Sequence, residues 1–358
     1  MDNCNLKVVA CKIELKNFRC FKDTQFDIDA PLIIIEGGNG TGKTSLIEAL
    51  YFASHVRSFK TAHVENIIMQ NEQAFFLKLC FNENTFLYIG VEKKKKIIKI
   101  NQKTVKSLTE INENINAISI VETDIQIIQG GPSDRRFFLD QTLVLLDDQL
   151  VSEFKKLKIV LKNRNDFLSQ RIQNKTLYDI LTEQLFACSL KIQLKRHELL
   201  ECLAFQINKL ISEFNLSIKT VSFAYNPKID TTDKNNAFEK INNYKNNEYM
   251  QCRSLFGAHL DDFSILCGNF DTRKQCSRGQ QKLLTILLKI SAAKLYSRRN
   301  DNIIFLIDDF ITDLDETNIR LVMNMLCSLK CQLIFTTPLA LFLEKYIIKN
   351  FNVSIIRL

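Results

Sequence analysis

The sequence predicts an α/β fold that a long α-helical segment interrupts. Strand-like and helix-like patterns alternate over roughly the first 130 residues and return at about Ser254. Between these parts, apolar residues recur every three or four positions, which is typical of amphipathic helices. A glycine-rich loop lies in the first α/β part, and a strand that ends in two acids lies in the last. We therefore expect residues 1–133 and 251–358 to form the two parts of one head, and residues 134–250 to form a helical arm.

The composition is that of a globular protein with an ordinary core. Of the 358 residues, 46% are hydrophobic and 25% are charged. Apolar runs fall short of the ~18–20 residues that a membrane span requires, and residues 1–5 lack the start of a signal peptide. Eleven cysteines stand as singles, which favours reduced thiols. We expect a cytoplasmic protein that does not associate with a membrane, and the net charge of +8 leans toward an anionic partner.

The most informative motif is the glycine-rich loop at residues 37–44. It fits G-x-x-x-x-G-K-[ST] and stands between an apolar run at residues 31–35, which predicts a strand, and a helical pattern at residues 45–53. Such a loop turns backbone N–H groups toward phosphates at a helix N-terminus. The expected ATP-binding residues are Gly37, Gly38, Asn39, Gly40, Thr41, Gly42, Lys43, Thr44 and Ser45. Lys43 would reach the β- and γ-phosphates, and the Thr44 hydroxyl would ligate Mg²⁺. The alternative is a glycine-rich turn without a nucleotide.

Outside the glycine-rich loop and its helix, the pattern of the first α/β part mainly predicts strands. Residues 11–15 and 24–28 predict strands before the loop, and residues 75–106 predict a β-meander. Lysines cluster at one of its turns and shortly after it, at Lys93, Lys94, Lys95, Lys96, Lys99, Lys103 and Lys106. Such a cluster is typical of a solvated turn, and it also suits a hairpin that contacts phosphate groups. The sequence leaves both interpretations open.

The middle of the chain predicts two long helices. Apolar residues at helical spacing extend from residue 134 to about 172 and from about 177 to 214. Two antiparallel helices of ~35–40 residues would form an arm up to ~55–60 Å long, and an ordinary helical bundle fits the same pattern. Residues 226–250 hold few apolar side chains and predict a loop or a weak helix.

The second nucleotide motif is the apolar run at residues 303–307 followed by Asp308 and Asp309. A strand that ends in two acids is the Walker B pattern. Asp308 would hold Mg²⁺, and Asp309 would act as the general base that orients or deprotonates the attacking water. Lys43, Asp308 and Asp309 are therefore the expected catalytic residues, with Thr44 and Asp308 on the metal.

The third motif is residues 276–281, which precede a helical run. A Ser-x-Gly-Gln sequence that opens a helix resembles the signature of ABC-type ATPases, in which Ser277, Gly279 and Gln280 would contact the ATP of a second subunit. The alternative is a plain helix N-cap at Ser277. The order of phosphate loop, signature and Walker B favours the ABC interpretation. Residues 312–315 resemble the D-loop, where Asp315 would help pack two active sites together. Thr336 follows the next strand, where many ABC ATPases place a phosphate-sensing histidine.

Across nearly its whole length the chain resembles the RecF family, the SMC-like ABC ATPases of DNA replication and repair. The resemblance is carried by residues 15–19, 57–59, 131–140, 163–165, 257–262 and 277–281. It implies that Arg19 lies near the nucleotide. Three positions depart from the family pattern: Glu122 stands where proline is usual, Leu260 where arginine is usual, and Arg278 where glutamine is common.

The resemblance implies an ATPase that dimerises on ATP, clamps double-stranded DNA at single-strand gaps, and helps load RecA together with RecR and RecO. Hydrolysis would be weak, stimulated by DNA, and would reset the clamp. Two alternatives remain open: a passive DNA-binding scaffold without ATP turnover, and the ATPase subunit of an ABC system that does not act on DNA.

Overall fold

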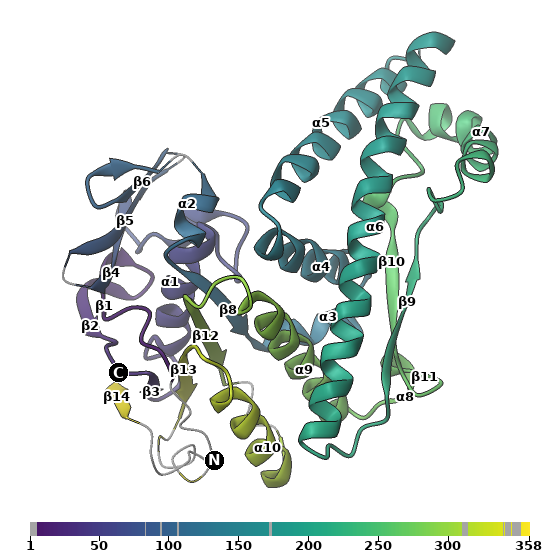
Figure 1. Ribbon diagram of the computed structural model, residues 1–358. Helices are drawn as coiled ribbons and strands as arrows, with labels where there is room; N and C mark the ends of the chain where they lie inside the picture. Colours follow the sequence, from purple (N-terminus) through teal and green to yellow (C-terminus); the bar gives the residue numbers. More distant parts are fainter. Residues whose placement is uncertain are drawn as a thin grey trace. The chain divides into compact units, whose positions relative to one another are not determined.

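The computed structural model describes residues 6–82, 84–93, 95–105, 107–171, 174–309, 314–338, 340, 345 and 352–358. The chain forms two compact units (Figure 1): the head unit, residues 1–124 and 282–358, and the arm unit, residues 125–281. Among the residues that the structure describes, every helix is too short or too polar to span a bilayer.

One sheet of the head unit is antiparallel. Its strand order is β2-β1-β4-β5-β6-β7, with β1 (Lys12–Phe18), β2 (Phe21–Asp27), β4 (Ala74–Asn82), β5 (Thr85–Glu92), β6 (Lys95–Ile100) and β7 (Lys103–Thr104). The predicted β-meander at residues 75–106 is thereby confirmed as the run from β4 to β7. Buried residues alternate with more exposed ones along β1, as expected of a sheet with one face on the core.

The other sheet of the head unit is parallel and carries the nucleotide motifs. Its order is β14-β3-β13-β12-β8, with β3 (Leu32–Glu36), β8 (Asn116–Ile120), β12 (Ile303–Asp308), β13 (Gln332–Thr337) and β14 (Val353–Arg357). β3 and β12 are near-continuous apolar runs because both of their faces are buried. The parallel register pairs Asp308 with Thr336 and Thr337 with Glu36, so these strands end at one edge of the sheet.

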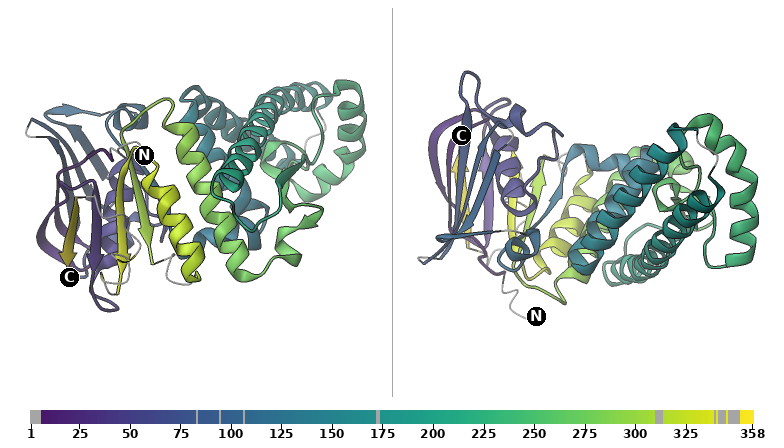
Figure 2. Two further views of the ribbon diagram at one scale, coloured as in Figure 1. Left: turned by 60° about the horizontal axis from the view of Figure 1, so that its bottom comes forward. Right: turned by 90° about the horizontal axis from the view of Figure 1, so that it is seen from above.

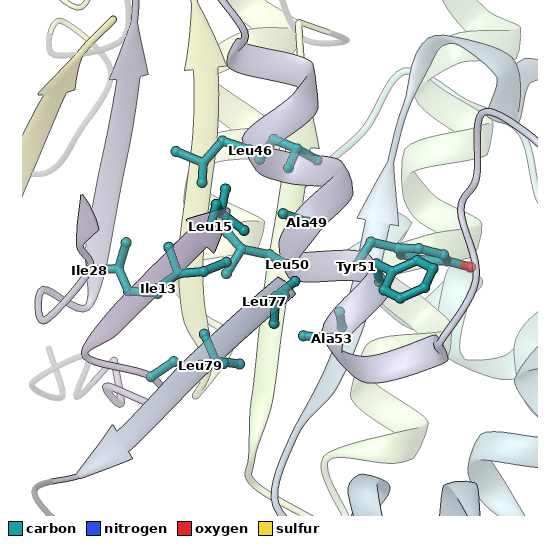
Figure 3. Packing of buried hydrophobic residues seen from close by; sticks show 14 of the residues in the cluster. Ile13, Leu15, Ile28, Leu46, Ala49, Leu50, Tyr51, Ala53, Leu77 and Leu79 are labelled. Atoms are coloured by element: carbon teal, nitrogen blue, oxygen red, sulfur yellow. The ribbon is translucent and has the colours of Figure 1, made fainter. Parts of the chain in front are cut away.

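The core of the head unit packs around α1 (Lys43–His55). Figure 3 shows Leu46 and Leu50 of this helix against Ile13, Leu15, Leu77 and Leu79 of the antiparallel sheet. Ile304 and Leu306 of β12 belong to the same cluster. Because side chains alternate along a strand, Phe305 faces the opposite side, where α10 (Glu316–Cys327) lies along the parallel sheet (Figure 2). The remaining helices are α2 (Leu108–Asn112), η1 (Val64–Ile67), η2 (Glu122–Ile125) and α9 (Arg278–Tyr296), most of which belongs to this unit.

The arm unit is built on two long helices that lie side by side (Figure 1), α5 (Gln149–Ser169) and α6 (Lys175–Glu213). At 1.5 Å per residue, the 39 residues of α6 extend about 58 Å. The other elements are α3 (Gln126–Gln129), α4 (Pro132–Leu146), β9 (Val221–Asn226), α7 (Lys234–Gln251), η3 (Ala258–Leu260), β10 (Asp262–Cys267), β11 (Phe270–Asp271) and α8 (Thr272–Gln275). The sheet order is β11-β10-β9.

One helix prediction needs correction, and a second, which left two alternatives open, is decided in favour of a helix. The single helix predicted for residues 134–172 is two helices, because Asp147 adopts an extended conformation and its carboxylate accepts the backbone N–H of Gln149 at 3.0 Å. The segment expected to be a loop or a weak helix contains α7, although only Ala237, Ile241 and Glu248 of that helix are buried.

The compact units divide the chain at other residues than the expected boundaries at 133/134 and 250/251. The arm unit begins at Ile125 and runs to Gln281. Its later boundary follows from packing: β10 pairs antiparallel with β9 from Asp262 to Cys267, and Phe256 and Ala258 belong to a core cluster with Leu185 of α6. Residues 251–281 therefore fold with the helices and not with the parallel sheet.

Candidate nucleotide site

The glycine-rich loop joins β3 to α1, as the sequence predicts. Gly40 and Gly42 have φ angles of 83° and 110°, a left-handed region that glycine adopts without steric cost. A Cβ atom at Gly42 would lie 2.7 Å from Cys20 Sγ and 2.9 Å from Phe21 Cζ. The loop therefore requires glycine at this position both for its backbone and for its packing.

Lys43 is placed to bind phosphate. Its side chain is only 5% exposed, and Nζ donates hydrogen bonds to the carbonyl oxygens of Gly37 at 2.8 Å and Gly38 at 3.0 Å. The ammonium thus stays within the loop, next to the N-terminus of α1, whose first N–H groups favour an anion. The other loop residues predicted to bind ATP surround it and are exposed or partly exposed: Asn39, Gly40, Thr41, Thr44 and Ser45.

Thr44 and Asp308, predicted to hold Mg²⁺, lie together although 264 residues separate them. The Thr44 hydroxyl donates to Asp308 Oδ1 at 3.1 Å, because β12 ends at the same sheet edge as β3, which leads into the loop. A hydroxyl and a carboxylate side by side are oxygen ligands of the kind that Mg²⁺ prefers. The residues present therefore fit the metal.

Thr336 contacts both acids of the Walker B motif. Its hydroxyl donates to Asp308 Oδ1 at 2.8 Å and accepts the backbone N–H of Asp309 at 3.0 Å. The contact of Thr336 with ATP stays a prediction, and in the structure its hydroxyl bonds the Asp308 carboxylate and the Asp309 backbone. A threonine can hold these groups and cannot titrate, unlike the histidine common at this position.

Asp309 has the properties of a general base. Its φ angle of 46° turns the chain sharply after β12. Burial raises the pKa of Asp309 above its ordinary value and the Asp308 carboxylate adds to the shift, whereas Lys43 and Thr336 oppose it. A carboxylate with a raised pKa at the end of a Walker B strand suits proton abstraction from water.

Arg19 lies beside the loop helix and makes protein contacts there. Its Nε and NH2 atoms donate to the two carboxylate oxygens of Glu48 at 2.8 and 2.7 Å, and NH1 donates to the Asn66 carbonyl at 2.6 Å. Glu48 is fully buried on α1 and also accepts the Ser58 hydroxyl. Sequence reasoning missed Glu48, although a lone acid within the apolar run of this helix was a usable signal.

The signature residues form a helix cap in the arm unit. The Ser277 hydroxyl accepts the N–H of Gln280 at 3.3 Å, and the Gln280 side chain accepts the N–H of Ser277 at 2.9 Å, which is a reciprocal capping box at the start of α9. Gly279 is exposed, and a Cβ atom there would meet no described atom within 4 Å. Packing within the described part of the chain therefore does not require a glycine at this helical position.

Asp315, the D-loop residue, caps α10. Its carboxylate accepts the N–H of Asn318 at 2.8 Å and the side-chain amide of Asn318 at 2.6 Å. Thr312 and Asp313 of the same motif lie outside the described residues.

Two stretches that resemble the RecF family bind each other inside the arm unit. Arg135 makes a bidentate pair with Asp262 at 2.7 and 2.9 Å, and Arg136 donates to the Asp261 carbonyl at 2.6 Å. Arg196 of α6 joins them by pairing with Asp140 and donating to the Ala258 carbonyl. The charged residues of both stretches thus hold α4 and α6 to the segment before β10.

The lysine cluster is only partly described, because Lys94 and Lys106 lie outside the described residues. Lys93 and Lys95 are exposed at the turn between β5 and β6. Lys96 instead donates to the Val56 carbonyl at 3.3 Å, so it supports the chain after α1.

Comparisons with known proteins agree with this geometry. The model of the RecF/RecN/SMC N-terminal domain matches residues 9–355. The chain is 27% identical over 330 residues to the DNA replication and repair protein RecF of Acholeplasma laidlawii, covering 91% of this chain and 93% of the relative. It is 29% identical over 329 residues to that of Francisella tularensis subsp. novicida, with coverage of 91% and 93%.

Solved structures agree in fold. The ATP-bound recombination mediator protein RecF of the RecFOR pathway superimposes with a TM-score of 0.81 at 24% identity, over 92% of this chain and 91% of that one. The Smc head bound to a domain of ScpA gives 0.53 at 14% identity, over 94% and 91%. Fold and site together define an SMC-like ATPase of the ABC type. Within that class, the chain belongs to the RecF family.

Proposed function

We propose that the chain is an ATP-switched DNA-binding protein of replication and recombinational repair. Binding of ATP would join two copies around DNA, and slow hydrolysis, stimulated by DNA, would separate them. The observation that carries this proposal is the assembly of Lys43, Thr44, Asp308 and Thr336 at one edge of the parallel sheet.

The head unit supplies the groups for hydrolysis. Lys43 and the N-terminus of α1 would bind the phosphates, and Asp309 would accept a proton from the attacking water. Thr44 and Asp308 would hold Mg²⁺, which when bound supplies positive charge against the phosphate oxygens. Thr336 would keep both acids in place.

Gly279 supports the proposal that a second copy completes the site. Gly279 is the second residue of α9, and no described neighbour requires a glycine there. A glycine without a packing role near a helix N-terminus is suited to close approach by a phosphate. Ser277, Gly279 and Gln280 would contact ATP held by the other copy, and Asp315 would lie near the junction.

The proposals about DNA, partner proteins and cellular compartment are based on the relatives of this chain. They are named DNA replication and repair proteins, and the solved structures belong to the RecFOR pathway. We infer that this chain binds duplex DNA at gaps, works with RecR and RecO to load RecA, and acts in the cytoplasm. The net charge of +8 agrees with a nucleic-acid partner.

Sedimentation with and without Mg-ATP, combined with an assay of released phosphate, tests the proposal. We expect ATP to convert monomers to dimers, and Asp309→Asn to lower hydrolysis by about 10²–10⁴-fold while leaving ATP-dependent dimers intact. Lys43→Arg should lose both dimers and hydrolysis. Monomers that persist with ATP in both the unmodified protein and Asp309→Asn would contradict the proposed switch.

A further inference from the structure

The arm unit contains an open pocket that includes none of the residues of the phosphate loop, the signature or the Walker B motif. Its volume is about 500 Å³, and it lies among α5, α7, the segment after β9 and the segment after α7. Lys228, Arg253, Asn165, Ser254 and His259 contribute to its wall. All of these residues belong to one compact unit, so the cavity does not depend on how the two units are placed.

The cavity wall is positively charged. Lys228 and Arg253 line it, and none of its described lining residues carries a carboxylate. Neither cation forms an ion pair within the described part of the chain: Arg253 donates to the Gln251 side chain at 2.9 and 3.1 Å, and the Lys228 ammonium lies 5.9 Å from the Tyr244 ring. Two cations in a lining without a carboxylate favour the binding of an anion there, although the Asp261 carboxylate accepts the Lys228 backbone N–H at 3.0 Å.

The inner wall offers oriented hydrogen-bond donors. Asn165 Oδ1 accepts both the N–H and the hydroxyl of Ser254, each at 2.8 Å. Because these bonds fix the amide oxygen, the two donors of its nitrogen are fixed as well. Ser254 is in turn tied to Arg164, which is completely buried and paired with Glu248. Hydrogen bonds and a buried ion pair thus fix the positions of Asn165 and Ser254 in this wall.

His259 is the unusual group of this wall. Its Nδ1 atom is buried and has no hydrogen-bond partner among the described residues. Burial and the guanidinium groups of Arg136, Arg164 and Arg196 lower the pKa of His259 to about 4, and a hydrogen bond with the Ser254 backbone opposes that shift. The imidazole is therefore neutral at pH 7, in part because the guanidinium groups around it disfavour a further positive charge.

We propose that this cavity binds a phosphate group, with Lys228 and Arg253 as its cationic ligands and Asn165 as a neutral donor. The geometry favours phosphate because charged and amide donors surround a volume that is large enough for a phosphate with an attached group. The phosphate belongs either to a free small molecule or to a nucleic-acid backbone. The inference goes beyond the proposed ATP switch and does not require ATP hydrolysis.

Occupation of the cavity would change the titration of His259. A phosphate beside the ring stabilises the charged imidazolium and raises its pKa. The charged groups around the ring come from several elements: Arg136 on α4, Arg164 on α5, Arg196 on α6, and Lys228 and Arg253 at the cavity, with Asp140, Glu248 and Asp261 paired to the arginines. Those carboxylates already pair with arginines. An added anion would therefore interact mainly with Lys228 and Arg253, whose side chains have no carboxylate partner among the described residues.

Nuclear magnetic resonance of the imidazole C–H groups in the full chain tests the proposal, because the protein has only four histidines. The signal of His259 is assigned by its loss in His259→Gln. We expect inorganic phosphate, added at constant ionic strength against chloride, to raise the pKa of His259 by about one unit. Lys228→Met should abolish the shift, and Lys219→Met, which removes an exposed lysine of the same unit, should preserve it.

A short DNA duplex in place of phosphate distinguishes the two sources. A shift with inorganic phosphate identifies a small-phosphate site, and a shift with the duplex alone identifies a site for the nucleic-acid backbone. Either shift must disappear in Lys228→Met and remain in Lys219→Met. The proposal is overturned if neither ligand moves the His259 titration, if chloride moves it equally, or if Lys228→Met responds like the unmodified protein. ATP-dependent dimerisation is a separate measurement, so failure here leaves the proposed switch untouched.

Discussion

Thr336 donates its hydroxyl to Oδ1 of Asp308 at 2.8 Å, and the parallel register of β12 and β13 sets these two residues opposite each other. The same hydroxyl accepts the N–H of Asp309 at 3.0 Å. One uncharged side chain thus fixes the proposed metal ligand and the proposed general base. It occupies the place where many ABC ATPases use a histidine.

Thr336→Val should lower kcat for ATP hydrolysis roughly five- to tenfold, the effect of losing one hydrogen bond of about 1 kcal/mol. The Thr336 bond lowers the pKa of Asp309, so its loss raises that pKa further. A general base works in its ionised form, and the rate therefore rises with pH through this pKa. The acid limb of the kcat profile should move to higher pH in Thr336→Val and stay in place in Thr336→Ser. Identical profiles for all three proteins would show that Thr336 does not act on the base.

Glu48→Gln should destabilise the head unit by about 1–3 kcal/mol, because the buried acid accepts hydrogen bonds from Arg19 and Ser58. Glu65→Gln changes an exposed acid of the same unit and serves as the control. Urea denaturation measures the stability of the two variants. An equal midpoint for the two variants would mean that the Arg19–Glu48 pair contributes little to folding.

Glu248→Gln should lower the free energy of unfolding by about 3–5 kcal/mol, because it leaves the fully buried guanidinium of Arg164 without its carboxylate. Tyr178 and the backbone N–H of Leu255 also donate to Glu248, so α7 depends on this one acid. Glu239→Gln, at an exposed position of the same helix, should change stability by less than about 0.5 kcal/mol. Limited proteolysis would report whether α7 detaches, and equal protection of α7 in the two variants would argue against its dependence on Glu248.

Gly279→Ala separates folding from assembly. A Cβ atom there meets no described neighbour, so the variant should fold with a stability within about 0.5 kcal/mol of the unmodified protein. It should nevertheless lose ATP-dependent dimers, if a phosphate of the second copy approaches this glycine. Gly42→Ala, by contrast, should disrupt the phosphate loop of each single copy, because its Cβ would collide with Cys20 and Phe21. If Gly279→Ala formed ATP-dependent dimers normally, the signature residues would not contact the ATP of the second copy as proposed.

The nucleotide motifs could be predicted because their information is local. The phosphate loop needs a strand, a glycine turn and a helix within about 20 residues, and all three follow from short-range patterns. The contact between Thr44 and Asp308 was expected from the motifs' shared chemistry. The role of Thr336 was not, because it depends on the strand order β3-β13-β12.

The missed features depend on contacts between distant residues. The apolar repeat continues past Asp147, so the break between α4 and α5 leaves little trace in the pattern. α7 looks too polar for a stable helix because its anchor is the ion pair of Glu248 with Arg164, which lies 84 residues earlier. Residues 251–281 resemble a return to the head, although their strand β10 pairs with β9 of the arm unit.

Binding of a labelled gapped duplex with and without Mg-ATP tests the central claim most directly, at one fixed near-physiological salt concentration because basic proteins bind any DNA at low salt. We expect ATP to raise the affinity at least about tenfold, or by 1.4 kcal/mol. Asp309→Asn should prolong the complex, and Lys43→Arg should lose the effect of ATP. Equal binding with and without ATP, unchanged in both variants, would contradict an ATP-switched clamp and leave a passive basic surface.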